Sequence, residues 1–175
     1  MAEETLKNNR INKNLMNTDY ILLSPTIDDI PEIKDLSYSI WKEDGIYSDI
    51  FYESMLNDNL SYIYKDQEKN IIIAICLALY EEEEDEVNIS VLCVKKEYQR
   101  KGLGKSILEE CIENCVKNRY TNFYLHVAIT NEKAIKLYEK IGFRKIKFIK
   151  NYYTNDPPPH NSSFLMRLIK YKKAE

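Results

Sequence analysis

The chain has 175 residues, of which 44% are hydrophobic and 30% are charged, and its formal net charge is −3 at pH 7. This length suffices for one domain with a hydrophobic core, and the acidic balance argues against nucleic acid as the main partner. No apolar run approaches the ~18 residues of a membrane-spanning helix, and the N-terminus lacks the apolar core of a signal peptide. We therefore expect a soluble protein without a membrane partner.

The N-terminal third predicts a tail, a strand and two helices. Residues 1–19 are rich in Asn, Lys and Glu and predict a disordered tail, whereas residues 20–23 predict a short strand. A helix begins near Pro31 with acidic residues in its first turn, and a shorter helical segment at 51–56 follows the break at Gly45. The first helix carries one apolar face, made of Ile30, Ile33, Leu36, Ile40 and Trp41.

Two strands and an acidic segment occupy the middle of the chain. Residues 60–64 predict a strand that turns over 66–70, and the nine apolar residues at 71–79 predict a strand buried on both faces. Six consecutive acids follow at 81–86. We interpret them as a solvated hairpin loop; the alternative is a region that attracts a cationic substrate.

The next predicted strand, residues 87–94, changes the parity of its apolar positions. They alternate with polar residues up to Val91, whereas Leu92 and Val94 lie out of phase with them. A β-bulge produces such a one-residue slip, and a continuously apolar strand end would produce the same pattern without a bulge.

A short basic turn with two glycines, residues 99–105, separates this strand from a helix predicted over 104–117. Backbone N–H groups at a helix start favour an anionic phosphate, and glycine lets the backbone approach a ligand closely. The P-loop pattern requires a glycine where Gln99 stands, and the dinucleotide-binding pattern requires one where Ile107 stands. Because both patterns fail, the turn predicts either another class of phosphate-carrying cofactor or an ordinary capped helix.

The C-terminal third continues the alternation of strands and helices. The predicted elements are a strand over 122–127, a helix over 131–143, and strands over 144–153 and 164–169. Asn131 is the candidate N-cap of the helix, Gly142 is its stop, and prolines stiffen the loop at 156–159. The order of elements predicts an α/β fold with a mixed sheet, parallel in the middle and with hairpins at both ends.

Four cysteines lie within these apolar patterns. Cys111 and Cys115 are four residues apart on one helix face, a spacing that a metal site would allow. The patterns favour the other interpretation, small buried hydrophobic side chains, so we expect no metal. Reduced cysteines are typical of a cytoplasmic location, with the nucleus as an alternative.

The turn at 99–104 and the segment 131–143 together resemble the GCN5-related N-acetyltransferase (GNAT) family. The turn has the pattern Gln/Arg-x-x-Gly-x-Gly/Ala of the family's acetyl-CoA pyrophosphate loop, and the second segment resembles the other half of its cofactor site. The resemblance covers most of residues 87–143. It implies a single GNAT domain over 20–171, with a short tail at 172–175. The family's sheet is mostly antiparallel with a splayed parallel strand pair, flanked by about four helices.

The resemblance also implies acetyl-CoA as the co-substrate. In the family, the splayed strand leaves hydrogen-bonding groups free for the pantetheine arm, and a tyrosine at the place of Tyr138 protonates the departing thiolate. The residues that the resemblance assigns to acetyl-CoA are Leu92, Cys93, Val94, Gln99, Arg100, Lys101, Gly102, Leu103, Gly104, Lys105, Asn131, Ala134 and Tyr138.

Within the family, the sequence is most similar to protein N-terminal acetyltransferases of the Naa50 type. Residues 47–52, 124–127, 129–132 and 151–153 carry this similarity. It implies transfer of acetyl groups to the α-amine of protein N-termini by direct attack in a ternary complex. It also implies peptide N-termini as partners, together with an auxiliary N-terminal acetyltransferase subunit. The implied substrate contacts are Tyr47, Ser90, Tyr152 and Tyr153.

His126 is the implied general base. A peptide α-amine with a pKa of about 8 is mostly protonated at neutral pH, and histidine is suited to remove that proton. From the residues alone, His126 also fits a structural histidine on a half-buried strand, and Tyr138 also fits core packing. Because neighbouring strand residues point to opposite faces, we expect one of Tyr152 and Tyr153 to meet substrate and the other to pack.

Two positions depart from the Naa50 pattern. The family's second catalytic tyrosine falls on Asn88, whose amide cannot serve as a base, and the Phe-Pro-Val of the first substrate loop is replaced by a longer segment over 41–45. The acids Glu43 and Asp44 in that segment favour a basic second residue or a lysine side chain. The alternatives are therefore a lysine or small-amine acetyltransferase, and a catalytically impaired CoA-binding subunit.

Overall fold

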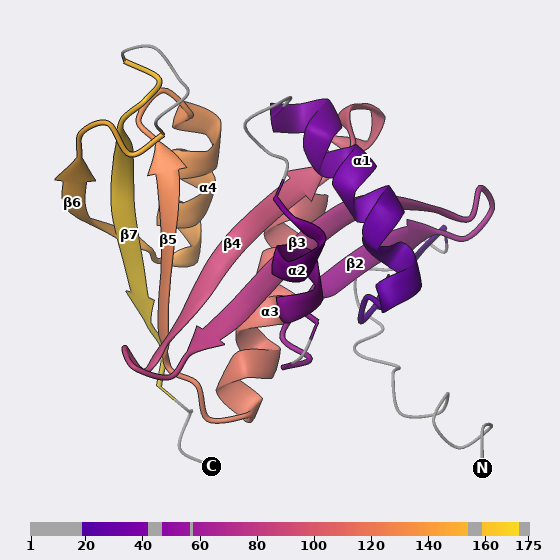
Figure 1. The fold of residues 1–175 in the computed structure, drawn as a ribbon, viewed down its shortest axis with the longest axis horizontal. Helices are drawn as coiled ribbons and strands as arrows, with labels where there is room; N and C mark the ends of the chain where they lie inside the picture. Colours follow the sequence, from indigo (N-terminus) through magenta and orange to yellow (C-terminus); the bar gives the residue numbers. More distant parts are fainter. Residues whose placement is uncertain (1–18, 42–46, 57, 154–158, 172–175) are drawn as a thin grey trace.

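The computed structural model describes residues 19–41, 47–56, 58–153 and 159–171. Within these ranges seven strands form one sheet in the order β1-β2-β3-β4-β5-β7-β6 (Figure 1). The strands are β1 (Tyr20–Leu23), β2 (Tyr62–Asp66), β3 (Ile71–Glu81), β4 (Glu86–Val94), β5 (Asn122–Ala128), β6 (Arg144–Ile149) and β7 (Ser163–Ile169). The helices are α1 (Ile30–Trp41), α2 (Asp49–Ser54), α3 (Leu103–Lys117) and α4 (Glu132–Ile141), with short 3-10 helices η2 (Ile27–Asp29) and η4 (Lys96–Tyr98).

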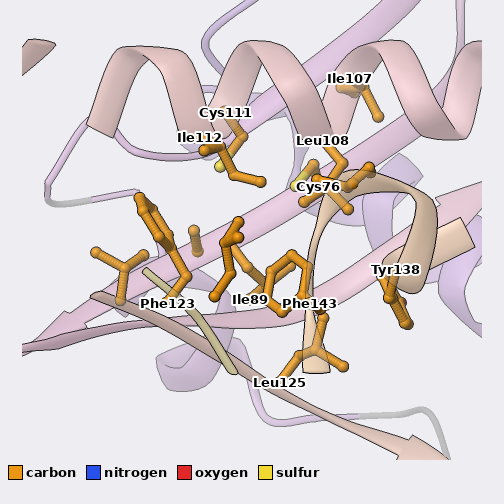
Figure 2. Close-up of a cluster of buried hydrophobic side chains, with 14 of the residues drawn as sticks. Cys76, Ile89, Ile107, Leu108, Cys111, Ile112, Phe123, Leu125, Tyr138 and Phe143 are labelled. Carbon is orange, nitrogen blue, oxygen red and sulfur yellow. The ribbon is translucent and has the colours of Figure 1, made fainter. Parts of the chain in front are cut away.

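The helices cover the sheet on two sides. Helices α1 and α2 pack on one face, here called the α1 side, through a core that includes Ile33 and Tyr52. Helices α3 and α4 pack on the opposite face, the α3 side, where Leu108 of α3 belongs to the same buried cluster as Phe123 and Leu125 of β5 (Figure 2). Each helix thus buries its apolar stripe against the sheet, which is the arrangement that hydrophobic periodicity predicts.

Strand β3 is buried on both faces from Ile72 to Ala78, as its unbroken apolar run predicts. Its neighbour β4 contains the β-bulge: the register against β3 shifts and skips Ser90. As a result Ile89 packs on the α3 side, whereas Val91 packs on the α1 side. The parity slip in the apolar pattern of this strand is therefore a real bulge.

Strands β4 and β5 form the one parallel pair among the described strands, and they pair only at one end. The register joins Val87 to Phe123 and Asn88 to Tyr124. Beyond this point the strands diverge, as Figure 1 shows, while β5 stays paired with β7 along its whole length. The splayed parallel pair expected from the sequence is thus present, and the edge of β4 from Ser90 onward is not paired with β5.

Several element boundaries differ from the sequence prediction, and the helical segment expected at 51–56 is α2, Asp49–Ser54. Strand β2 begins and ends two residues later than expected, at Tyr62 and Asp66. Strand β3 extends to Glu81, so the acidic turn is confined to residues 82–85. Strand β6 ends at Ile149, which corrects the strand predicted to residue 153. Tyr152 and Tyr153 therefore lie in the following loop, and the expectation that they face opposite sides of a strand is wrong.

Several expectations fall outside the described residues. They concern the N-terminal tail up to residue 18, the segment 42–46 with Glu43 and Asp44, the proline loop at 154–158, and the tail at 172–175. In the part of the chain that the structure describes, no helix is both long and apolar enough to span a membrane.

Candidate active site

The glycine turn leads directly into α3, the longest helix of the described residues. Arg100 and Gly102 both adopt left-handed backbone conformations, with φ angles of 62° and 84°. The first helical hydrogen bond joins the Ser106 N–H to the Gly102 carbonyl. The preceding backbone N–H groups of the helix therefore have no partner within it, and they form a positive end that suits an anion.

Space and charge around the turn fit a phosphate. A Cβ atom built on Gly102 would meet no heavy atom within 4 Å, so the turn is open at that point. A Cβ atom on Gly104 would instead lie 3.4 Å from Val94 Cγ2 and 3.8 Å from Leu137 Cδ2, so this glycine lets α3 approach β4 and α4 closely. The cations Arg100, Lys101 and Lys105 surround this helix start.

A hydrogen-bond network around Tyr98 holds the start of the glycine turn in place. The Tyr98 hydroxyl donates to Asp66 Oδ2 at 2.8 Å and accepts from Lys69 Nζ at 2.9 Å. Lys101 Nζ lies 5.1 Å from the centroid of the Tyr98 ring, a cation–π geometry, and Gln99 Nε2 donates to the Val94 carbonyl at 2.9 Å. Backbone donation by the Lys69 N–H, followed by the Tyr98 hydroxyl, lowers the pKa of Asp66. Sequence reasoning missed this network because its members come from separate elements.

Three predicted cofactor residues belong to α4 on the α3 side of the sheet: Ala134 and Tyr138 within the helix and Asn131 as its N-cap. Tyr138 is buried and packs edge-on against Phe143, with ring centroids 5.9 Å apart. Burial raises the pKa of its phenol, so the hydroxyl keeps its proton at neutral pH. Asn131 caps the helix, because its Oδ1 accepts from the Ala134 N–H at 3.2 Å. The cap is as the sequence predicts.

His126 points to the opposite face of the sheet. On β5, Phe123, Leu125 and Val127 pack on the α3 side, so Tyr124 and His126 face the α1 side. The imidazole stacks on the Tyr152 ring at 4.2 Å and 11°, and it meets Tyr124 edge-on at 5.9 Å. Its Nδ1 is buried without a hydrogen-bond partner among the described residues. Burial lowers the pKa of His126, and the nearby Glu81 opposes this effect.

Glu81 is a member of this cluster that the sequence did not assign to the site. Its Oε2 accepts from the Tyr124 hydroxyl at 2.6 Å, and its Oε1 accepts from Asn88 Nδ2 at 3.1 Å. Burial, followed by the hydrogen bond to Glu81, raises the pKa of Tyr124. The alternation of Leu79 and Glu81 along β3 was the available signal, but the run of six acids concealed it.

Two of the predicted substrate tyrosines, Tyr47 and Tyr152, gather on the same side. Tyr47 stacks on Phe51 with centroids 3.9 Å apart, and it lies close enough to Tyr152 to raise the pKa of that phenol, after burial as the larger cause. Tyr153 continues the loop, and its backbone N–H donates to the Asn161 carbonyl at 2.9 Å. The hydroxyl of Ser90, at the bulge, is buried without a partner in the described part of the chain.

The predicted site residues therefore form two groups on opposite faces of the sheet. The glycine turn, α3 and Tyr138 lie on the α3 side, whereas His126, Tyr47 and Tyr152 lie on the α1 side. Tyr153 lies near Tyr138. Strands β4 and β5 pair only at Val87 and Asn88 and diverge beyond them. This arrangement can hold an anionic carrier on one side and a basic acceptor on the other, with the reacting groups meeting between the two strands.

Comparisons with known proteins agree with this geometry. The model of the acetyltransferase (GNAT) family matches residues 27–143. The alanine N-acetyltransferase of ribosomal protein bS18 from Escherichia coli K12 is 38% identical over 69 residues, which are 39% of this chain and 47% of that protein. The match spans about half the length of these bacterial relatives. N-alpha-acetyltransferase 50 of Danio rerio is 30% identical over 114 residues, covering 64% of this chain and 68% of that protein.

Solved structures share the fold. Arabidopsis thaliana Naa50, in complex with the bisubstrate analogue CoA-Ac-MVNAL, superposes with a TM-score of 0.73 at 25% identity and covers 85% of this chain and 97% of that one. A chain of the NatC complex bound to Gag peptide and CoA gives a TM-score of 0.77 at 24% identity, with coverage of 87% and 99%. The mixed sheet with one splayed parallel pair, expected from the sequence, is confirmed as the fold of this family.

Proposed function

The chain belongs to the acetyltransferase (GNAT) family, and from this membership and the geometry of the site we propose that it acetylates the α-amine of protein N-termini with acetyl-CoA. One observation carries the proposal: a helix start suited to phosphate and a buried, unpartnered imidazole nitrogen lie on opposite sides of one strand divergence. The relatives named N-alpha-acetyltransferase 50 and alanine N-acetyltransferase support the α-amine as acceptor.

The chain's own residues fit acetyl-CoA, which supplies an activated acetyl group as a thioester when bound. The backbone N–H groups after Gly102, with Arg100 and Lys101, would hold its pyrophosphate. The unpaired edge of β4 near Leu92 would hold the pantetheine arm by backbone hydrogen bonds. The sequence also assigns Cys93 to the cofactor, and its side chain is buried in the core of the α1 side.

His126 and Tyr138 are suited to opposite proton transfers. Burial lowers the pKa of His126, so its imidazole is neutral at pH 7 and can take a proton from the incoming ammonium group. Burial raises the pKa of Tyr138, so its phenol holds a proton that it can donate to the departing thiolate. The two transfers occur on the two faces of the sheet.

The peptide would enter on the α1 side. Tyr152 stacks on His126 there and Tyr47 lies near Tyr152, and both would offer their hydroxyls to the first residues of an extended peptide. Ser90, at the bulge, has a hydroxyl available for the same backbone. An auxiliary subunit is also part of the proposal, supported by the likeness in fold to a chain of the NatC complex.

The test is an acetylation assay with matched peptides, read by mass spectrometry. Each peptide with a free α-amine and an internal lysine is paired with the same peptide carrying a formylated N-terminus. We expect acetylation of the first at its α-amine and no reaction of the second. Acetylated lysine in the blocked peptides would replace the proposal with a side-chain acetyltransferase. Binding of CoA without any turnover would instead favour a CoA-binding subunit.

A further inference from the structure

Glu81 differs from the other acids of the hairpin. Residues 82–85 are exposed in the turn, whereas Glu81 is half-buried at the end of β3. Both of its carboxylate oxygens accept hydrogen bonds from side chains, one from Tyr124 on β5 and one from Asn88 on β4. The carboxylate is therefore fixed between the two strands that diverge, on the face that carries His126.

We propose that Glu81 is a positioning residue for His126, whose carboxylate stabilises the imidazolium formed when His126 takes a proton from the substrate ammonium group. The inference rests on the proposed function. In this step an N–H bond of the ammonium breaks, a bond forms between that proton and an imidazole nitrogen, and the lone pair stays on the amine. No oxidant, reductant or further reactant takes part.

Among the described residues around His126, Glu81 is the charged group that acts on it. Tyr152 covers one face of the imidazole and Tyr124 meets its edge, and both phenols are neutral because their pKa values are raised. Arg167 lies opposite Tyr124 on β7, but its guanidinium is paired with Glu86 at 2.9 Å. The carboxylate of Glu81 is then the charged group whose field reaches the ring, and it favours the protonated form.

Tyr124 gives Glu81 a defined position. Its hydroxyl donates to the carboxylate at 2.6 Å, and its ring meets the imidazole edge-on, so Tyr124 contacts both groups. Asn88 donates from the other side. Because two donors hold the carboxylate, its distance from the imidazole stays constant when the imidazole is protonated. The negative charge is therefore preorganised to stabilise the imidazolium.

The chain allows a direct measurement because it has only two histidines, His126 and His160. In a His160→Gln background, a single imidazole remains, and its pKa is read by NMR titration. We expect Glu81→Gln, which keeps an acceptor for Tyr124 but removes the charge, to lower the pKa of His126. Glu83→Gln removes the same charge from the exposed turn and should leave it unchanged. An unchanged pKa in Glu81→Gln would overturn the proposal.

Kinetics supply the second readout. We expect the acid limb of kcat/KM to move to lower pH in Glu81→Gln, with the plateau reduced roughly tenfold, and Glu81→Asp to restore part of both. A loss limited to peptides with a cationic second residue, at an unchanged pKa, would make Glu81 a specificity residue and overturn the proposal. If the wild type acetylates no peptide amine while the NMR shift occurs, the proposed function fails and the coupling of Glu81 to His126 stands.

Discussion

At the scale of single residues, burial sets the protonation states that the proposed chemistry needs. The same physical cause, removal of water from an ionisable group, lowers the pKa of His126 and raises that of Tyr138. The base is thereby kept neutral and the acid kept protonated at pH 7. Neither residue needs a dedicated charged partner for this, and Glu81 adjusts only the histidine.

Replacing His126 with alanine tests its role as a base. We expect His126→Ala to lower kcat/KM by about 100-fold, because the substrate amine then loses its proton acceptor. The affinity for CoA, measured by calorimetry, should change little, since the helix start that would hold CoA lies across the sheet. The exposed His160 provides the matched control, and His160→Ala should keep full activity. Equal activity of both variants would remove His126 from the mechanism.

Substitutions of Gly102 separate strain from charge. Its φ of 84° is left-handed, and a Cβ atom there meets open space, so Gly102→Ala introduces backbone strain of about 1–2 kcal/mol without a clash. Gly102→Glu adds the same strain together with a carboxylate facing the phosphates. We therefore expect weakened CoA binding in the first variant and none detectable in the second. Equal affinities by calorimetry would argue against a phosphate at this turn.

The lowered pKa of His126 also predicts how stability depends on pH. The pKa of His126 is lower in the folded than in the unfolded protein, so folding favours the neutral imidazole. Above the unfolded pKa of about 6.5, His126 does not affect the free energy of unfolding. As the pH falls below that value, the unfolded state binds a proton more readily than the folded state, so the folded protein is progressively destabilised. Urea denaturation at pH 7.5 and 5.5 should show a smaller acid-induced loss in His126→Gln than in the wild type.

At the scale of elements, the features that depend on local sequence patterns could be predicted from the sequence. The contacts between residues far apart in the chain could not. The parity slip near Leu92 revealed the bulge because each strand residue must choose one of two packed faces. The helix limits at Asn131 and Gly142 followed from capping chemistry. Glu81, however, meets Tyr124 from 43 residues away, and no local pattern contains that contact. The loop that stacks Tyr152 on His126 was likewise not predicted, because the sequence from residue 144 was interpreted as one strand up to residue 153.

The junction between α4 and β6 offers a matched pair of phenylalanines. Phe143 is 2% exposed and packs on Tyr138, whereas Phe148 on β6 is 53% exposed. We expect Phe143→Ala to cost about 3–5 kcal/mol in unfolding free energy, as a buried aromatic leaves a cavity. Phe148→Ala should cost about 1 kcal/mol or less. Urea unfolding curves measure both, and equal costs would contradict the packing described for the α3 side.

At the scale of the whole molecule, two hydrophobic cores share one sheet, and the sheet is incomplete where β4 leaves β5. The backbone groups along that edge of β4 are not paired with β5 and are suited to a ligand of extended shape. A bound pantetheine arm would take the place of the missing strand pairing, so binding and folding stability are coupled.

CoA binding should therefore raise the melting temperature. At a ligand concentration 100-fold above its Kd, binding to the folded state alone stabilises by about 2.7 kcal/mol, and each kcal/mol is worth roughly 2–4 °C for a domain of this size. Differential scanning fluorimetry of the wild type should show this rise, and Gly102→Glu should not. An unaltered melting temperature in the wild type would contradict a CoA site.

The placement of His126 and Tyr138 on the two faces of one sheet has a kinetic consequence. In the proposed function, peptide and thioester would reach the reacting groups from opposite faces of the sheet, so neither would block the entry of the other. The two substrates should bind in random rather than compulsory order. Each product should leave from the face on which its substrate bound. Inhibition patterns would then be competitive between each product and its own precursor, and mixed between unrelated pairs.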